Sequence, residues 1–208
     1  MTDKQKRKSL LRLAFFVAIL VLILDQGSKI WVKTTMELSE EFPVLGDWFY
    51  IHFTENNGMA FGMELAGDYG KLILSLFRIV AVSLIAWYLY KLPEKGASKG
   101  IMISGALIFA GALGNIIDSA FYGLIFNDSY YQTASFLPEG GGYAPFLFGK
   151  VVDMLYFPLY EGFLPESIPF WGGDYFIFFR PVFNIADSAI SIGVISVLLF
   201  HRSFFSEK

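Results

Sequence analysis

The sequence predicts a membrane protein with an all-α core of four transmembrane helices, a small extracytoplasmic β-sheet and an extracytoplasmic loop insert. Composition is the first reason. Of 208 residues, 55% are hydrophobic and only 17% are charged, whereas about a quarter of the residues in soluble domains are charged. The second reason is that four apolar stretches are long enough to cross a bilayer. The third is the uneven distribution of charge between their connections.

The apolar stretches give the expected spans. The first follows a basic start, as in a secretory signal peptide, but no small-residue cleavage site comes after it and the apolar pattern continues to Val32. We therefore expect it to be retained as a transmembrane helix. The expected spans of this single membrane domain, residues 1–208, are 12–33, 72–90, 101–126 and 182–200.

Charge in the connections predicts the orientation of the spans. Both chain ends and the connection between the second and third spans contain lysine or arginine, whereas residues 34–70 contain acidic side chains and neither Lys nor Arg. Basic loops tend to stay on the cytoplasmic side, so both termini are expected there. The expected cytoplasmic segments are 1–11, 91–100 and 201–208, and the expected extracytoplasmic segments are 34–71 and 127–181.

Both outer segments carry structural signals. Residues 48–53 are rich in strand-forming side chains and Asn56-Asn57-Gly58 is a turn signal. We therefore expect a small sheet on the outer membrane surface, with an aromatic belt without a sheet as the alternative. Segment 127–181 contains many glycines and prolines and is expected to be mostly loop. Its aromatic residues argue against disorder.

Composition also limits the chemistry. The chain has no cysteine and two histidines, so thiol catalysis, disulfides and metal sites built from Cys or His are not expected. The net charge of −3 argues against a nucleic-acid partner. Carboxylates remain as the main candidates for acid–base catalysis.

Polar side chains gather at the outer ends of the expected spans, where burial of charge is costly. Within each span they are three or four residues apart, so they share a helix face. Explanations without catalysis exist for each: an ion pair that holds helices together, interhelical hydrogen bonds, or stabilisation of a helix start. The candidates are Asp25 with Lys29, Asn115 with Asp118, Asn184 with Asp187, and Asp153 within an apolar stretch of the second outer segment.

Carboxylates from separate segments are thus directed toward one layer. Two carboxyl groups that share a site cannot readily both ionise, so one keeps a proton near neutral pH. Such a pair can activate a water molecule and protonate a leaving group. A serine–lysine mechanism for Ser28 and Lys29 is disfavoured, because adjacent residues on a helix do not face each other.

Five short blocks occur at a consistent expected depth. They are Asp25-Gln26-Gly27-Ser28-Lys29, Glu55-Asn56-Asn57-Gly58-Met59-Ala60-Phe61-Gly62, Gly114-Asn115-Ile116-Ile117-Asp118, Val151-Val152-Asp153 and Phe183-Asn184-Ile185-Ala186-Asp187. Each block is weak by itself. In this order, over most of the chain, they resemble the lipoprotein signal peptidases (signal peptidase II), which are bacterial membrane aspartyl proteases.

The resemblance implies that Asp153 and Asp187 form the catalytic pair of an aspartic endopeptidase. It also implies a location in the bacterial inner membrane, an active site at the outer face, and no cofactor. The implied reaction is cleavage before a diacylglyceryl-modified cysteine in a prolipoprotein that arrives through membrane lipid. Nothing in the sequence requires a partner chain, so we expect a monomer. The residues implied to bind substrate or support the site are Asn57, Gly58, Ala60, Asn115, Asp118, Asn184, Asp25 and Lys29.

One departure from the family pattern concerns a cation. Many members carry Arg directly after the residue that matches Asp118, and this chain has Ser119 there. Arg78 lies about as far from the outer end of the second span as Asp118 lies from the outer end of the third, so the two depths match. We therefore expect Arg78 to replace the missing arginine.

The other departure is length. The connections before and after Asp153 are longer than the family resemblance leads us to expect. They leave room for inserts near 127–149 and 158–180. These inserts are expected to fold over the outer surface, either to shape access or to contact envelope proteins, or as surface decoration without a function.

Two other classes of function are compatible with acidic residues in a membrane. A proton- or ion-coupled transport protein needs polar groups at several depths, but the cytoplasmic halves of the expected spans are nearly devoid of charge. A structural envelope subunit predicts that no single carboxylate is indispensable. Variants of Asp153 and Asp187 distinguish both classes from a protease.

Overall fold

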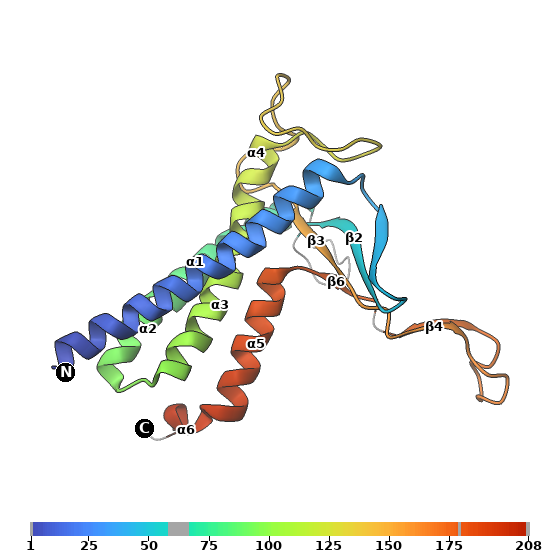
Figure 1. Ribbon diagram of the computed structural model, residues 1–208. Helices are drawn as coiled ribbons and strands as arrows, with labels where there is room; N and C mark the ends of the chain where they lie inside the picture. The colour runs from blue at the N-terminus through green and yellow to red at the C-terminus, as the bar shows by residue number, and fades with distance from the viewer. Residues whose placement is uncertain (1, 58–66, 179, 207–208) are drawn as a thin grey trace.

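The computed structural model describes residues 2–57, 67–178 and 180–206. A bundle of helices carries a small antiparallel sheet at one end, which we call the sheet end (Figure 1). The helices are α1 (Asp3–Thr35), α2 (Gly67–Lys91), α3 (Lys99–Ile117), α4 (Gly123–Ile125), α5 (Ile185–Phe200) and α6 (Arg202–Ser206). The strands are β1 (Glu41–Leu45), β2 (Phe49–Asn56), β3 (Val151–Tyr156), β4 (Tyr160–Phe163), β5 (Tyr175–Phe178) and β6 (Val182–Phe183).

The helices have the length and composition of membrane spans. In the described part of the chain, three helical segments are long and apolar enough to cross a bilayer: Asp3–Thr35, Tyr69–Lys95 and Lys99–Ile125. The fourth expected span corresponds to α5, which is apolar but has 16 residues. It begins later than expected because Val182 and Phe183 pair with β3 and Asn184 caps the helix. This is the pattern of a multi-pass membrane protein, with a fourth span that length alone does not establish.

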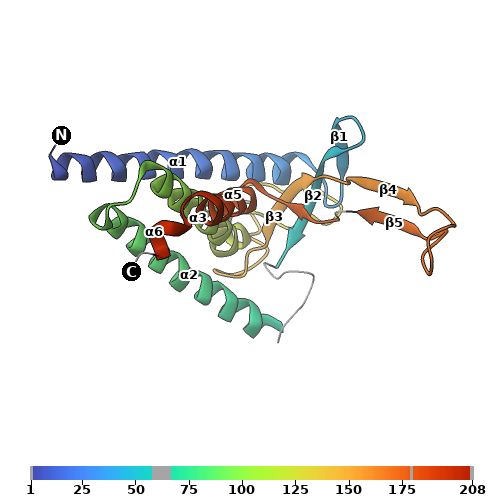
Figure 2. The same cartoon turned by 90° about the horizontal axis from the view of Figure 1, so that it is seen from below.

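Helix α3 is the centre of the bundle and packs against α1, α2 and α5 (Figures 1 and 2). Glycines on α3 allow the close approach of its neighbours. A Cβ at Gly111 would lie 2.2 Å from the carbonyl oxygen of Ala186 on α5, and one at Gly114 would lie 2.6 Å from the Asp25 carboxylate on α1. Larger residues at either position would push the sheet ends of these helices apart.

The main sheet has the strand order β1-β2-β3-β6, and every neighbouring pair is antiparallel. It confirms the expectation of a small sheet. Strand β2 continues through Asn56, which pairs with Val151, so Asn56 belongs to the ladder and not to a turn. Strand β3 forms in a segment that we expected to be mostly loop. Its first four residues, from Val151, are buried, which explains the apolar character of this stretch.

The segment between α4 and β3 is fastened to the end of α3. Residues Asp118–Tyr122 form a π-helical turn, and such turns leave carbonyl groups open to other donors. The Gly149 N–H donates to the Ser119 carbonyl at 2.8 Å, and the Leu147 N–H donates to the Ala120 carbonyl at 3.3 Å. This docking leads the chain directly into β3.

A second, two-stranded sheet of β4 and β5 extends away from the helices (Figures 1 and 2). It lies in the chain between β3 and β6, so the chain leaves the main sheet after β3 and returns to it immediately before α5.

Candidate active site

The start of α5 fixes two of the expected residues. The Asn184 side chain accepts a hydrogen bond from the Asp187 N–H at 2.9 Å, and the Asp187 carboxylate accepts one from the Asn184 N–H at 3.4 Å. This reciprocal arrangement is a capping box. It turns the Asp187 carboxylate back toward the sheet, where the positive end of the helix dipole favours negative charge.

Strand β3 places Asp153 next to the start of α5. We call this junction of β3 and α5, which carries Asp153 and Asp187, the corner. The Asn184 side-chain amide donates to one Asp153 oxygen at 2.7 Å, and the Asn56 amide donates to the other. The Asp153 side chain is nearly inaccessible to solvent, at 3% exposure. Burial, and secondarily the negative charge of Asp187, raise the pKa of Asp153 to about 7. Asp153 and Asp187 are thus electrostatically coupled.

Asn115 connects this corner to a buried cation. Its side-chain N–H donates to the Asp187 carboxylate at 2.8 Å. Its side-chain oxygen accepts from the Lys29 ammonium at 2.9 Å and from the Asn184 amide at 3.0 Å. Because the oxygen faces Lys29, the N–H group of Asn115 must face Asp187.

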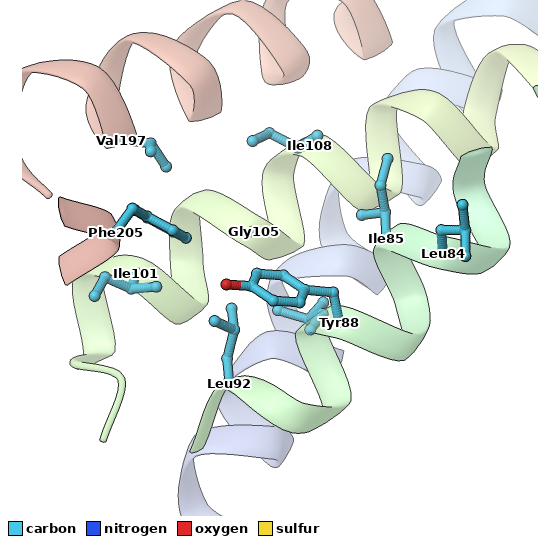
Figure 3. Close-up of a pocket in the computed structure, with 10 residues that line it drawn as sticks. Leu84, Ile85, Tyr88, Leu92, Ile101, Gly105, Ile108, Val197 and Phe205 are labelled. Atoms are coloured by element: carbon cyan, nitrogen blue, oxygen red, sulfur yellow. The ribbon is translucent and has the colours of Figure 1, made fainter. Parts of the chain in front are cut away.

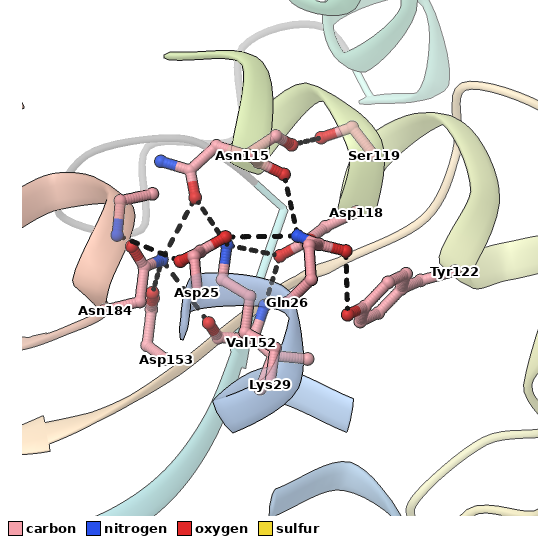
Figure 4. Close-up of polar contacts among 12 residues, drawn as sticks. Asp25, Gln26, Lys29, Asn115, Asp118, Ser119, Tyr122, Val152, Asp153 and Asn184 are labelled. Carbon is pink, nitrogen blue, oxygen red and sulfur yellow. Dashed lines mark hydrogen bonds and ion pairs between the residues drawn. The ribbon is translucent and has the colours of Figure 1, made fainter. Parts of the chain in front are cut away.

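Lys29 holds the helices together beneath the corner (Figure 4). Its ammonium lies 3.0 Å from the Asp25 carboxylate and 2.9 Å from the Asp118 carboxylate, and all three side chains are fully buried. Both carboxylates also accept hydrogen bonds from backbone N–H groups. The Ala186 N–H donates to Asp25 at 2.9 Å, and the Val152 N–H donates to Asp118 at 3.2 Å. The three charged groups therefore connect α1 and α3 to the elements that carry Asp187 and Asp153.

Three residues of this network were missed by the sequence analysis: Asn56, Gln26 and Tyr122. The Gln26 amide donates to Asp118 at 2.8 Å, and the Tyr122 hydroxyl donates to the Gln26 side-chain oxygen at 3.2 Å. In the sequence, each of the three is a polar residue that lies in an apolar stretch or in one of the blocks that resemble the family. Asn56 was assigned to a turn, although the aromatic and β-branched run before it allows the strand to continue to this residue.

Arg78 faces the corner from α2. It is half-buried, and its charge interacts with Asp187 and Asp153. Arg78 is therefore a cation beside the two carboxylates, and its replacement of the missing arginine stays a prediction. The side chain of Ser119, which occupies the family's arginine position, donates to the Asn115 backbone carbonyl at 3.0 Å.

The remaining expected residues belong to the segment after β2. The Asn57 side chain accepts a hydrogen bond from Lys71 at 3.0 Å, and Lys71 also donates to the Phe148 carbonyl at 2.7 Å. Asn57 therefore connects the end of β2 to the start of α2. Gly58 and Ala60 lie outside the described residues.

A second buried charge cluster, which we call the Glu55 cluster, lies beside the candidate site. Glu55 accepts hydrogen bonds from Lys33 and, at 3.3 Å, from Lys150. Lys33 also donates to Ser129 at 2.9 Å. The Lys150 N–H donates to the Tyr143 hydroxyl at 2.7 Å. The Glu55 cluster thus ties the segment between α4 and β3 to α1 and β2.

The chemical capacity of the corner follows from its groups. It contains one carboxyl group that favours its protonated form and one carboxylate at a helix start, held by amide donors and flanked by Arg78. This combination suits acid–base catalysis. In the part of the chain that the structure describes, no group of three His, Cys, Asp or Glu side chains is arranged to hold a metal ion.

An apolar cavity of about 350 Å³ lies elsewhere, between α2, α3, α5 and α6 (Figure 3). Its lining includes Leu84, Tyr88, Gly105, Val197 and Phe205. No carboxylate lines this cavity. We therefore assign the chemistry to the corner and not to this cavity.

Comparison with known proteins agrees with the geometry. A family model described as Signal peptidase (SPase) II matches residues 17–205. A lipoprotein signal peptidase of Porphyromonas gingivalis (strain W83) is 54% identical over 182 residues, which cover 87% of this chain and 79% of that protein. A lipoprotein signal peptidase of Amoebophilus asiaticus is 38% identical over 190 residues, which cover 90% of this chain and 76% of that protein.

Solved structures of similar shape are also known. A bacterial membrane enzyme determined by the in meso method at 1.9 Å resolution has a TM-score of 0.57 and 28% sequence identity, covering 89% of this chain and 90% of that chain. A second such enzyme, at 2.3 Å resolution, has a TM-score of 0.53 and 25% identity. The helical bundle with its small sheet is therefore the fold of a known kind of membrane enzyme.

Proposed function

Because the chain belongs to the signal peptidase II family, we propose that this membrane protease is an aspartic endopeptidase that removes signal peptides from diacylglyceryl-modified prolipoproteins. The substrate class is supported by its relatives, which are named lipoprotein signal peptidases. The mechanism is supported by the corner between β3 and α5. A transport function has no comparable support, because the family is one of proteases.

The observation that carries the mechanism is the coupling of Asp153 to Asp187. The two residues come from different elements, yet one asparagine, Asn184, contacts both. Two neighbouring carboxyl groups hold one proton between them more readily than none. This is the protonation state that an aspartic protease needs.

The surroundings of the two carboxyl groups support different roles. Asp153 is buried and its pKa is raised to about 7, so near neutral pH it holds a proton far more often than an ordinary aspartate does. Asp187 lies at a helix start, accepts the Asn115 N–H and interacts with Arg78, and each of these favours negative charge. We therefore assign Asp153 as the acid and Asp187 as the base.

Hydrolysis then proceeds through a tetrahedral intermediate. Asp187 accepts a proton from water as the water oxygen bonds to the carbonyl carbon of the scissile peptide. Asp153 transfers its proton to the carbonyl oxygen, which yields a neutral diol. The C–N bond breaks as the proton on Asp187 passes to the leaving nitrogen, and a diol proton returns to Asp153 as the new carboxylic acid forms. Both aspartates finish in their starting states.

The same proposal includes the placement in the membrane. We infer four spans, both termini in the cytoplasm and the active site at the outer face of the bacterial inner membrane. Lysines and arginines at the end of the bundle opposite the sheet support this orientation. A diacylated substrate enters from the lipid, and a site at the membrane boundary remains within reach of water. Asn57, Gly58 and Ala60 are proposed to contact this substrate.

The test is cleavage of a diacylglyceryl prolipoprotein by purified variants. Asp153→Asn and Asp187→Asn are each expected to lose activity at least about a hundredfold, which is the scale of general acid–base catalysis. Asp47→Asn is the matched control, because this aspartate is exposed and lies in the turn between β1 and β2. Near-normal activity in a folded Asp153→Asn or Asp187→Asn protein would refute the mechanism.

A further inference from the structure

The hairpin of β4 and β5 with its connecting loop, residues 159–178, carries exposed aromatic side chains along its whole length. We call it the aromatic arm. Phe170, near its tip, is 96% exposed. Its exposed large hydrophobic residues are Leu159, Tyr160, Phe163, Phe170, Trp171, Tyr175, Phe176 and Phe178. Contiguous apolar surface of this kind marks an interaction site.

The internal contacts of the arm do not cover these side chains. Its strands pair Tyr160 with Phe178 and Phe163 with Tyr175. These two pairs lie on opposite faces, because alternate residues of a strand point to opposite sides. Aromatic residues are therefore exposed on both faces of a two-stranded hairpin. Such a hairpin is at best marginally stable in water, so it needs a surface around it.

The position of the arm identifies that surface. The chain passes from the arm through β6 directly into the first turn of α5. Figure 1 shows the arm running sideways from the bundle, and Figure 2 shows it projecting beyond the helices. The ends of apolar helices mark the boundary between acyl chains and headgroups. Aromatic side chains are enriched at this boundary, because their rings are partly apolar and partly polar.

The arm is also continuous with aromatic residues of the main sheet. The Phe157 ring stacks on Phe49 at 4.6 Å and on Phe183 at 5.7 Å, and it lies 6.1 Å from Trp48. Phe157 comes shortly before β4, and Phe183 comes shortly after β5. A group of stacked rings thus lies where the arm joins the main sheet.

We propose that the aromatic arm is an interfacial anchor that lies in the outer boundary of the bilayer crossed by the helices. Residues 159–178 contain acidic side chains and neither lysine nor arginine. Binding therefore depends on burial of aromatic surface and not on attraction to anionic lipid. Because the arm joins β3 to β6, its anchoring fixes the level of Asp153 and Asp187 relative to the membrane. This last consequence rests on the proposed function.

The test uses the absence of cysteine from the chain. Phe170→Cys carries a nitroxide label in full-length protein reconstituted at low density into phosphatidylcholine vesicles. Collision rates are measured with oxygen, which concentrates in lipid, and with a water-soluble nickel chelate. The control is Tyr131→Cys, because Tyr131 is 97% exposed and also has a positive φ, as Phe170 has. It belongs to the segment after α4, which Figure 1 shows beyond the end of α4 and apart from the arm.

The ratio of oxygen to nickel collisions is expected to be several-fold higher at position 170 than at position 131, and to be unchanged by salt. Equal ratios at the two positions would overturn the proposal. So would protection at position 170 that disappears as the lipid-to-protein ratio rises, because it would indicate a second copy of the chain. The measurement requires no enzymatic activity, so its outcome is independent of the proposed function.

Discussion

Two buried carboxyl groups lie at the sheet end of the molecule in opposite electrostatic situations. Glu55 accepts hydrogen bonds from Lys33 and Lys150, so its charge is neutralised by cations from two segments. Asp153 accepts hydrogen bonds from the uncharged amides of Asn184 and Asn56 and faces the charge of Asp187. The strands that carry the two carboxyl groups are neighbours in one sheet.

Burial and charge therefore do not by themselves identify a catalytic group. A carboxylate that is satisfied by cations has little to gain from binding a proton, so it serves to hold segments together. A buried carboxyl group beside another carboxylate retains a proton and can donate it. The Glu55 cluster is therefore expected to govern stability, and Asp153 to govern chemistry.

The largest expected effect is a loss of folding stability when the Glu55 cluster is broken. Glu55→Gln leaves Lys33 buried without a carboxylate partner, and breaking a buried ion pair costs about 3–5 kcal/mol. The melting temperature of the purified protein is expected to fall strongly, while cleavage per folded molecule, measured well below that temperature, falls much less. Thermal unfolding and initial cleavage rates of the same preparation measure both effects.

Lys150→Met is the matched control for that variant. Lys150 is partly exposed and its contact with Glu55 is longer, at 3.3 Å, so its loss is expected to lower the melting temperature less. The comparison fails if Glu55→Gln has a normal melting temperature, or if it loses activity as completely as Asp187→Asn while it remains folded.

The sequence predicts the residues of this site better than it predicts their geometry. Helix periodicity and membrane depth identified Asp25, Lys29, Asn115 and Asp118, because regular helices place residues three and four apart on one face. Their meeting point with Asp153 was proposed from the family resemblance. Sequence periodicity does not predict that Asp153 meets these residues, because β3 lies in a segment rich in glycine and proline that is expected to be loop.

Long-range pairing explains what sequence reasoning missed. Asn56 reaches Asp153 because β2 and β3 pair in a register that no local signal encodes. The Glu55 cluster joins residues from α1, β2 and the segment between α4 and β3, and its lysines carried no sign of a buried partner. Chain length alone predicts inserts near 127–149 and 158–180. Only the structure shows that the first segment docks against the end of α3, whereas the second extends away from the helices.

The second effect concerns the pH dependence of stability. The pKa of Asp153 rises from an ordinary value of 3.8 to about 7 on folding. Between these values the folded chain holds a proton that the unfolded chain has released, so stability is greatest below the lower value and falls as pH rises through the higher one. Each unit corresponds to about 1.4 kcal/mol. The melting temperature is therefore expected to fall between pH 5 and pH 8.

Asp153→Asn cannot titrate, so its melting temperature is expected to vary less over the same range. The wild-type cleavage rate is expected to fall above about pH 7, as the pair loses its shared proton. Parallel slopes for wild type and Asp153→Asn would show that another group is responsible. Rates that keep rising to pH 9 would contradict the assignment of Asp153 as the acid.

The smallest expected effect concerns Arg78, whose charge interacts with Asp187 and Asp153 from α2. Removal of a half-buried cation from a carboxylate costs on the order of 1 kcal/mol, so Arg78→Gln is expected to lower the cleavage rate about tenfold or less. Without this cation the negative form of the pair is less favoured, so the fall in rate at high pH should move to higher pH. Arg78→Lys retains the charge and is expected to restore most of the rate and the original pH dependence. If Arg78→Gln cleaves at the normal rate with an unshifted pH profile and normal stability, Arg78 does not replace the family's missing arginine.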